Sequence, residues 1–260
     1  MTNQTNQTNQ TSQTSQTNMK HRLDKLLLAR NLTASRQQAQ ALIGAGQVLV
    51  NGQVIDKAGA QISEEALIEI KERCPYVSRG GLKLAGGLDF FHLDPAGFIC
   101  ADVGASTGGF TDCLLQHGAA KVYAIDVGYG QLDWKLRQDP RVVVMERTNA
   151  RHLQPGDIAD PLDLAVIDAS FISLRLLLPP LLAFFRNQPL ILALIKPQFE
   201  VGKGKVGKGG VVRDELLHEA VIADISAFAA GLHLQGRGIT ESPILGPKGN
   251  REFLILLSGE

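Results

Sequence analysis

The segment FICADVGASTGGF, residues 98–110, decides the fold of the domain that contains it. It begins as an apolar run, reaches an acid at Asp102, turns on glycines and continues as a helical pattern. That order predicts a buried parallel strand, a tight turn and a helix. Because Gly104, Gly108 and Gly109 lack a Cβ, the backbone of the turn can come close to a ligand. The segment therefore predicts a binding site at the carboxyl end of the strand.

A second predicted strand, residues 121–125, ends at Asp126. A carboxylate in this place can accept hydrogen bonds from both hydroxyls of a ribose. Together with the glycine turn it indicates a ligand that contains adenosine. The alternative is a strand, turn and helix with a purely structural role.

Three classes of ligand compete for this site. A dinucleotide fingerprint requires a second glycine that admits the pyrophosphate, and Ser106 occupies that position here. A phosphate-binding loop requires a hydroxyl residue after its lysine. The nearest match, residues 202–208, is followed by Gly209, so we expect a flexible basic loop there. S-adenosylmethionine needs no phosphate site, and it offers a ribose to Asp126 and an amino-acid end to the glycine turn. We therefore expect S-adenosylmethionine as the cofactor.

The chain of 260 residues is long enough for one large and one small domain, and its hydrophobic content of 44% supports a real core. Its net charge of zero gives no sign of a nucleic-acid partner, so local charge has to be considered. The three cysteines lack the spacing of metal ligands, which indicates no metal site and suits a reducing cytoplasm. The sequence contains neither a spanning apolar run nor a secretory signal, so we expect a soluble, cytoplasmic protein.

Three segments divide the chain. Residues 1–18 are almost entirely Thr, Asn, Gln and Ser and are expected to be disordered, because they have nothing apolar to bury. Residues 19–75 are predicted to form a small domain and a linker. In residues 76–260, strands alternate with helices, which predicts an α/β fold with a doubly wound parallel sheet. After the strands at 98–103 and 121–125, further strands are predicted over 141–145, 163–168 and 189–195, a helix over 213–230, and a late hairpin near 232–241 and 252–257.

The small domain carries local positive charge. Between residues 19 and 60, six basic residues oppose two acidic ones, a net charge of +4. Phosphate contacts are the usual cause of such a surface, and a solvated pair of helices is the alternative. The helices are expected over residues 22–30 and 33–43, with Ser35 or Thr33 as a cap, before a hairpin over 48–55 with an Asn-Gly turn.

The pattern of this domain also resembles a known module. R-L-D-x-x-L begins at Arg22, and S-R-x-x-A-x-x-L-I-x-x-G-x-V-x-V-N-G begins at Ser35. This pattern is similar to the RNA-binding domain shared by a small-subunit ribosomal protein and many pseudouridine synthases. The resemblance implies that Arg22, Arg36 and Lys57 lie on a surface that faces structured RNA.

Three charged residues follow strands at the predicted ligand edge: Asp126, Asp168 and Lys196. Lys196 ends a wholly apolar run, so it either caps the sheet in an ion pair or has a function. In methyl transfer from a sulfonium to an oxygen, the enzyme must place the hydroxyl in line and help its proton leave. A lysine can accept that proton only when it is neutral, which burial or a second cation favours and carboxylates oppose.

The motif D-x-G-x-x-x-G-G-F from Asp102, followed by Asp168 and by KPQFE from Lys196, resembles the FtsJ-type ribose 2′-O-methyltransferases. The resemblance implies a Lys-Asp-Lys-Glu tetrad that falls on Lys83, Asp168, Lys196 and Glu241, although Glu252 is also in range of the last position. It further implies a cofactor pocket formed by the residues of the glycine turn and of the two following strand ends. They are Asp102, Gly104, Ser106, Thr107, Gly108, Gly109, Phe110, Asp126, Val127 and Asn149, the last of them near the adenine.

From Met19 onward, and including Y-V-S-R-G-x-x-K-L from Tyr76, the chain resembles the TlyA family, known both as haemolysins and as rRNA cytidine 2′-O-methyltransferases. The resemblance implies S-adenosylmethionine-dependent methylation of a ribose 2′-hydroxyl, with ribosomal RNA or a ribosomal subunit as the partner. Lys203, Lys205 and Lys208 form a basic loop that either contacts RNA or is simply solvated.

Two other classes of protein stay open. A membrane-damaging haemolysin would need an amphipathic or spanning segment, and the sequence shows neither. A non-catalytic RNA-binding assembly factor could keep a cofactor pocket. A complete tetrad favours the enzyme over such a factor.

Overall fold

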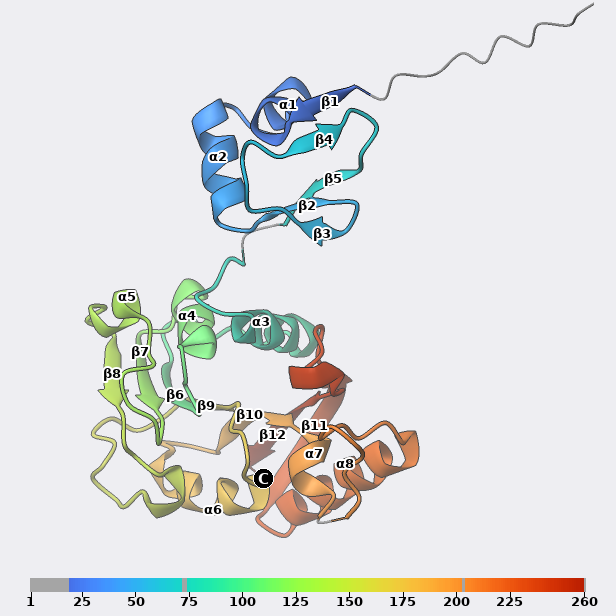
Figure 1. Ribbon diagram of the computed structural model, residues 1–260. Helices are drawn as coiled ribbons and strands as arrows, with labels where there is room; N and C mark the ends of the chain where they lie inside the picture. Colours follow the sequence, from blue (N-terminus) through green and yellow to red (C-terminus); the bar gives the residue numbers. More distant parts are fainter. Residues whose placement is uncertain (1–18, 72–73, 203, 260) are drawn as a thin grey trace, which may run out of the picture. The chain divides into compact units, whose positions relative to one another are not determined.

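The computed structural model describes residues 19–71, 74–202 and 204–259 (Figure 1). The polar tail over residues 1–18 and the loop residue Lys203 lie outside the described residues, so what the sequence predicts for them stays a prediction. Within the described ranges, no helix combines the length and the hydrophobicity needed to cross a membrane.

The chain divides into two compact units, residues 1–73 and 74–260, and each is described by itself. The smaller unit combines two helices with a two-stranded sheet, in which β1 pairs with β4, and a three-stranded sheet in the order β3-β2-β5. Its elements are β1 (Lys20–Arg22), α1 (Leu23–Ala29), α2 (Arg36–Gly44), β2 (Val48–Val50), β3 (Gln53–Val54), β4 (Gln61–Ser63) and β5 (Ile68–Ile70).

Local sequence accounts for these elements. The Ser35 hydroxyl accepts a hydrogen bond from the backbone amide of Gln38 at 3.1 Å, so Ser35 is the cap of α2. Asn51 and Gly52 both have positive φ, 50° and 78°, as the predicted Asn-Gly hairpin turn between β2 and β3 requires. The core of the unit consists of apolar side chains from both helices and from β2, among them Leu23, Leu27, Ile43 and Val48.

The larger unit is built on a seven-stranded sheet in the order β11-β12-β10-β9-β6-β7-β8. Strands β8 to β10 in this order are parallel, whereas β12 is antiparallel to both β10 and β11. The predicted α/β fold with a late hairpin is confirmed. The strands are β6 (Ile99–Val103), β7 (Lys121–Ile125), β8 (Val142–Met145), β9 (Leu164–Ile167), β10 (Leu190–Ile195), β11 (Leu234–Glu241) and β12 (Phe253–Gly259).

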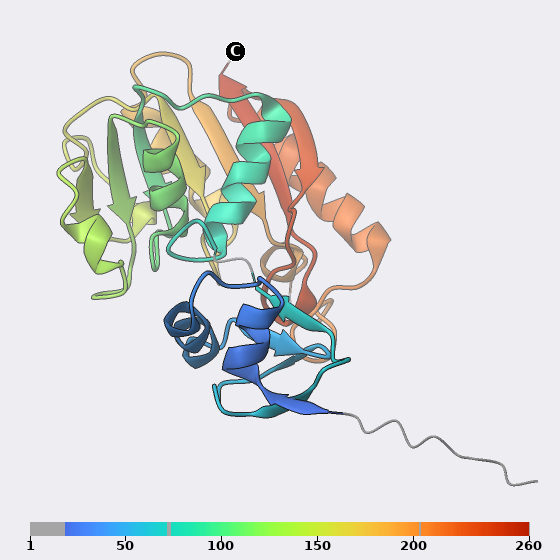
Figure 2. The same ribbon diagram turned by 90° about the horizontal axis from the view of Figure 1, so that it is seen from above.

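Helices cover both faces of this sheet (Figure 1). On one face, α3 and α4 pack on side chains such as Cys100 and Leu192, and on the other α6 and α8 pack on side chains such as Ala101 and Ile191. The helices are α3 (Gly80–Phe91), α4 (Gly109–Gln116), α5 (Trp134–Arg137), α6 (Leu178–Leu181), α7 (Pro197–Glu200) and α8 (Glu215–Ala230), with 3₁₀ turns at Ala150–His152, Leu174–Leu176, Leu182–Phe184 and Pro247–Gly249. Figure 2 shows the parallel strands side by side with their arrowheads at one edge. Asp126, Asp168 and Lys196 directly follow β7, β9 and β10.

Candidate active site

The glycine turn joins β6 to α4 and forms a cradle that a side chain would fill. Gly104 has a φ of 88°, and a Cβ built on it would lie 2.8 Å from the backbone oxygen of Asp168. Gly108, with a φ of 94°, lies at the N-terminus of α4, where a Cβ would collide with Leu136. Only glycine fits at these two positions, as the sequence pattern predicts.

Asp126 lies across from this turn, directly after β7. Its carboxylate accepts hydrogen bonds from the backbone amides of Ser106, at 2.8 Å, and Gly128, at 2.6 Å. These donors fix the orientation of the carboxylate and leave further lone pairs for a ligand. A cavity of about 430 Å³ opens beside it. Five of the predicted cofactor residues line this cavity: Gly104, Ser106, Asp126, Val127 and Asn149.

A second cavity, of about 590 Å³, lies on the other side of the glycine turn and is lined by Thr107, Gly109 and Phe110. Asp102, by contrast, is completely buried behind the turn, and its Oδ2 accepts the amide and the hydroxyl of Thr111 at 2.9 and 2.6 Å. Burial raises the pKa of Asp102 to about 7. Its expected place in the cofactor pocket is corrected to a position that fastens the start of α4 to β6.

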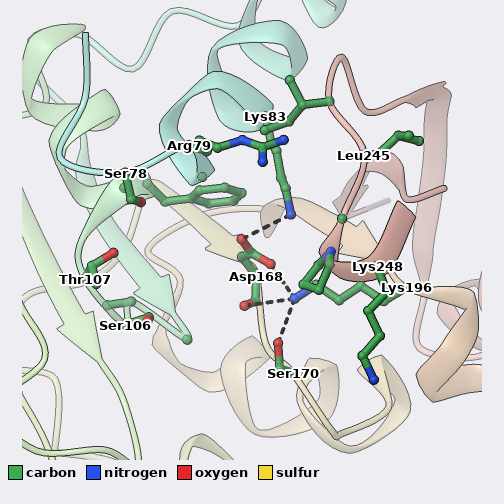
Figure 3. Close-up of a pocket in the computed structure, with 18 of the residues that line it drawn as sticks. Ser78, Arg79, Lys83, Ser106, Thr107, Asp168, Ser170, Lys196, Leu245 and Lys248 are labelled. Carbon is green, nitrogen blue, oxygen red and sulfur yellow. Dashed lines mark hydrogen bonds and ion pairs between the residues drawn. The ribbon is translucent and has the colours of Figure 1, made fainter. Parts of the chain in front are cut away.

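Lys83, Asp168 and Lys196 line the second cavity (Figure 3), and the buried carboxylate of Glu252 lies beside them. Lys196 Nζ lies 2.6 Å from Asp168 Oδ1 and 3.0 Å from Ser170 Oγ. Lys83 Nζ lies 2.6 Å from Glu252 Oε2 and 4.0 Å from Asp168 Oδ2. Lys83 and Lys196 are only 7% and 6% exposed, and Glu252 is completely buried. We call Lys83, Asp168, Lys196 and Glu252 the charged cluster.

Three of the four predicted tetrad residues meet in this cluster, but Glu241 does not. Glu241 ends β11 at the surface, where its carboxylate binds Arg251 at 2.7 and 2.8 Å. Arg251 and Glu252 directly precede β12, and their side chains have different partners: Arg251 binds Glu241, whereas Glu252 binds Lys83. The expected position of Glu241 is therefore corrected: the glutamate that lies with Lys83, Asp168 and Lys196 is Glu252.

The sequence analysis did not single out Ser170, which contacts Lys196, or Ser78 and Arg79, which line the second cavity. Ser170 lies two residues after Asp168, so its position near the end of a predicted strand could have marked it as a candidate site residue. Ser78 and Arg79 lie within the motif from Tyr76, which brought only Lys83 to attention.

In the smaller unit, the basic residues expected to face RNA surround a buried acid. Asp24 is completely buried and accepts hydrogen bonds from Arg22, Arg36 and Gln40 at 2.9 to 3.0 Å. These donors, Arg22 foremost, hold the pKa of Asp24 well below its usual range. Both guanidinium side chains stay 40% or more exposed. The other described basic residues of the prediction, Lys57, Lys205 and Lys208, are exposed.

The chain matches two families of known proteins. FtsJ-like methyltransferases match residues 76–258, and the S4 domain matches residues 21–68. The Mycobacterium tuberculosis protein named 16S/23S rRNA (cytidine-2′-O)-methyltransferase TlyA is 48% identical over 91% of this chain and 89% of its own length. Hemolysin A of Brachyspira hyodysenteriae is 42% identical over 90% of this chain and 98% of its own length.

A solved structure shows the same fold. The Streptococcus thermophilus protein, also named a hemolysin, shares 44% identity and superposes with a TM-score of 0.72 over 93% of this chain and 89% of that chain. The match of the larger unit and the identity to these relatives over nearly the whole chain show that the protein belongs to the FtsJ-like methyltransferase family and, with its S4 domain, to the TlyA proteins within it.

Proposed function

We propose that the protein transfers the methyl group of S-adenosylmethionine to the 2′-hydroxyl of a ribose in ribosomal RNA, with cytidine as the target nucleoside. The observation that carries this proposal is the charged cluster beside the glycine turn, in which Lys196 is held 2.6 Å from Asp168. Such a cluster suits the removal of a proton from a weakly acidic hydroxyl. The name of the Mycobacterium tuberculosis relative supports the choice of RNA and of cytidine.

The cavity beside Asp126 suits S-adenosylmethionine. Its glycine cradle at Gly104 leaves room that any side chain would fill, and the carboxylate of Asp126 is oriented by two amides for the hydroxyls of a ribose. Val127 and Asn149 would border the adenosine end, since both line this cavity. When bound, S-adenosylmethionine supplies an electrophilic methyl group on a sulfonium.

The charged cluster would handle the proton of the ribose hydroxyl. Lys196, in its neutral form, takes up this proton, and Asp168 orients its amine. Lys83 lies between Glu252 and Asp168, so its positive charge offsets part of the negative potential that Asp168 exerts at Lys196. Glu252 in turn fixes Lys83, because a buried ammonium needs a close counter-charge.

The S4 domain would dock the RNA. Arg22 and Arg36 present half-exposed guanidinium groups whose positions Asp24 fixes, and planar guanidinium groups bind phosphate well. Lys57 adds an exposed cation to the same unit. A ribosomal substrate also accounts for the expected cytoplasmic location.

The direct test is transfer of tritiated methyl groups to small and large ribosomal subunits and to naked rRNA from a strain that lacks the protein. We expect the wild-type protein to label a cytidine, and Lys196→Ala to abolish labelling while it keeps nearly full affinity for S-adenosylmethionine. Full activity of Lys196→Ala would refute the role of Lys196. RNA binding by the wild-type protein without any labelling would favour an assembly factor instead.

A second candidate function comes from the names of two relatives, which are called hemolysins. Leakage of dye from liposomes, measured with the purified protein, tests it. Leakage that persists in Asp126→Ala and Lys196→Ala variants would support a membrane-active protein whose action is separate from methyl transfer.

A further inference from the structure

Ser170 lies in the loop after β9 and is in contact with the amine of Lys196 (Figure 3). Its side chain is exposed, whereas Lys196 is only 6% exposed. Ser170 is therefore a solvent-exposed contact of the nearly buried Lys196 amine.

Ser170 also stands where three cavities meet. It lines the cavity beside Asp126, the cavity beside the charged cluster, and a third cavity of about 250 Å³ that Phe171 and Phe199 border. Of the described residues, Ser170 alone borders all three. If the cofactor fills the cavity beside Asp126, the ribose has to enter from one of the other two, and donor and acceptor meet next to Ser170.

The partners of the Lys196 amine differ in their chemistry. Asp168 offers its carboxylate at 2.6 Å and its backbone carbonyl at 3.5 Å. The carbonyl, and the carboxylate as long as it is ionised, can accept hydrogen bonds but cannot donate them. The hydroxyl of Ser170, at 3.0 Å, can accept and donate. A neutral amine has two N–H groups and one lone pair. In the structure the amine donates to Ser170 Oγ; once the amine has lost a proton, its lone pair can accept the O–H of Ser170 instead.

A second set of contacts keeps this arrangement in place. Glu200, four residues after Lys196, accepts hydrogen bonds from the Ser173 hydroxyl at 2.6 Å and from the Leu174 amide at 2.9 Å. The loop that carries Ser170 is thereby tied to the segment that carries Lys196. This tie holds the two groups in the alignment that proton transfer requires.

We propose that Ser170 is a further catalytic residue, which relays the proton of the ribose 2′-hydroxyl to Lys196. The inference rests on the proposed function. The ribose O–H bond breaks and its proton forms a new bond with Ser170 Oγ, while the original proton of Ser170 passes to Lys196 Nζ. The ribose oxygen forms its bond to the methyl carbon, and sulfur keeps the electron pair of the broken carbon–sulfur bond. Serine is unchanged at the end, and Lys196 has gained one proton.

The test compares Ser170→Ala and Ser170→Thr with Ser226→Ala, which removes a hydroxyl that donates to the carbonyl of Ile222 within α8. The single-turnover rate of methyl transfer is measured at saturating cofactor and ribosomal subunits, and cofactor affinity is measured by calorimetry. We expect Ser170→Ala to lose about 10²- to 10⁴-fold in rate, the usual contribution of acid–base catalysis. We expect Ser170→Thr to regain most of the rate, Ser226→Ala to match the wild type, and all three variants to keep the cofactor affinity.

The dependence of the rate on the fraction of D₂O adds a readout that a structural role would not change. A curved dependence in the wild type indicates two protons in flight, and a linear one is expected for any residual rate of Ser170→Ala. A wild-type rate in Ser170→Ala, or no rescue by threonine, would overturn the relay and leave the proposed function intact. A wild-type protein that labels no RNA would overturn both.

Discussion

Replacing Glu252 by Gln distinguishes two assignments of the glutamate in the proposed tetrad, Glu252 and Glu241. Glu252 is completely buried, and its Oε2 lies 2.6 Å from Lys83, whose next carboxylate, Asp168, is 4.0 Å away. Breaking a buried ion pair by removing one charge costs about 3–5 kcal/mol of stability. The amide oxygen can still accept one hydrogen bond, so we expect a loss of about 3 kcal/mol, near the lower end of that range. For a unit of this size, that corresponds to a melting temperature lowered by about 6–12 °C.

The matched control is Glu241→Gln. Its carboxylate is exposed at the surface and bound to an exposed Arg251, so water screens the pair and its loss should leave the melting temperature nearly unchanged. Thermal unfolding, calorimetry with S-adenosylmethionine and methyl transfer to ribosomal subunits are measured for both variants. We expect Glu252→Gln to lose about 100-fold or more in methyl transfer, the lower end of acid–base contributions, while cofactor affinity changes little. Loss of activity in Glu241→Gln, with stability and activity intact in Glu252→Gln, would refute the reasoning.

Two further variants test the cofactor site and the smaller unit. Asp126→Ala removes the charged acceptor for the ribose hydroxyls, and hydrogen bonds to a charged group contribute about 1.5–3 kcal/mol. Calorimetry should therefore show an affinity for S-adenosylmethionine weakened by about 10- to 150-fold. Unchanged affinity would exclude Asp126 as a residue that binds the cofactor. The depressed pKa of Asp24 means that its ionised form stabilises the fold at pH values above its unfolded pKa of about 4, and that this stabilisation is lost as the pH falls toward the folded pKa. The protection factors of the amides in residues 19–71 of the full chain, the ratios of intrinsic to observed exchange rate at each pH, should therefore fall between pH 5 and pH 3 in the wild type, and Asp24→Asn should show low protection at both pH values. Wild-type protection factors that do not change with pH would contradict the buried network.

The parallel sheet was predictable because its central strands β6, β7, β9 and β10 are buried on both faces. A buried parallel strand is a continuous apolar run that ends at a polar residue, as in Leu190–Ile195 before Lys196. The strand predicted over residues 189–195 therefore differs from β10 by one residue. The family inferred from the motifs is confirmed by the comparisons as well.

The site was predictable only where parallel strands end side by side. Strands β9 and β10 are neighbours, so Asp168 and Lys196 had to lie close together. Lys83 comes from α3, and its partner Glu252 is 169 positions away in sequence, so only the family resemblance indicated Lys83. Sequence position could not decide whether Glu241 or Glu252 lies beside Lys83. Glu241 pairs with Phe253 across β11 and β12, and Phe253 is the residue next to Glu252. A shift of one residue in an extended strand moves a side chain to the opposite face, and the sequence does not fix that register.

In the proposed reaction, the net charge of the cluster gives a reason to expect that Glu252 contributes to catalysis. With Lys196 neutral, as the proposed reaction requires, one ammonium faces two carboxylates, so the cluster carries a net charge of −1. Uptake of the ribose proton by Lys196 restores neutrality, which is favourable in a buried site where charges interact strongly. Without the charge of Glu252, the same proton would take the cluster from neutral to +1. The loss of Glu252 is therefore expected to make proton uptake by Lys196 less favourable, in addition to removing the counter-charge that holds Lys83.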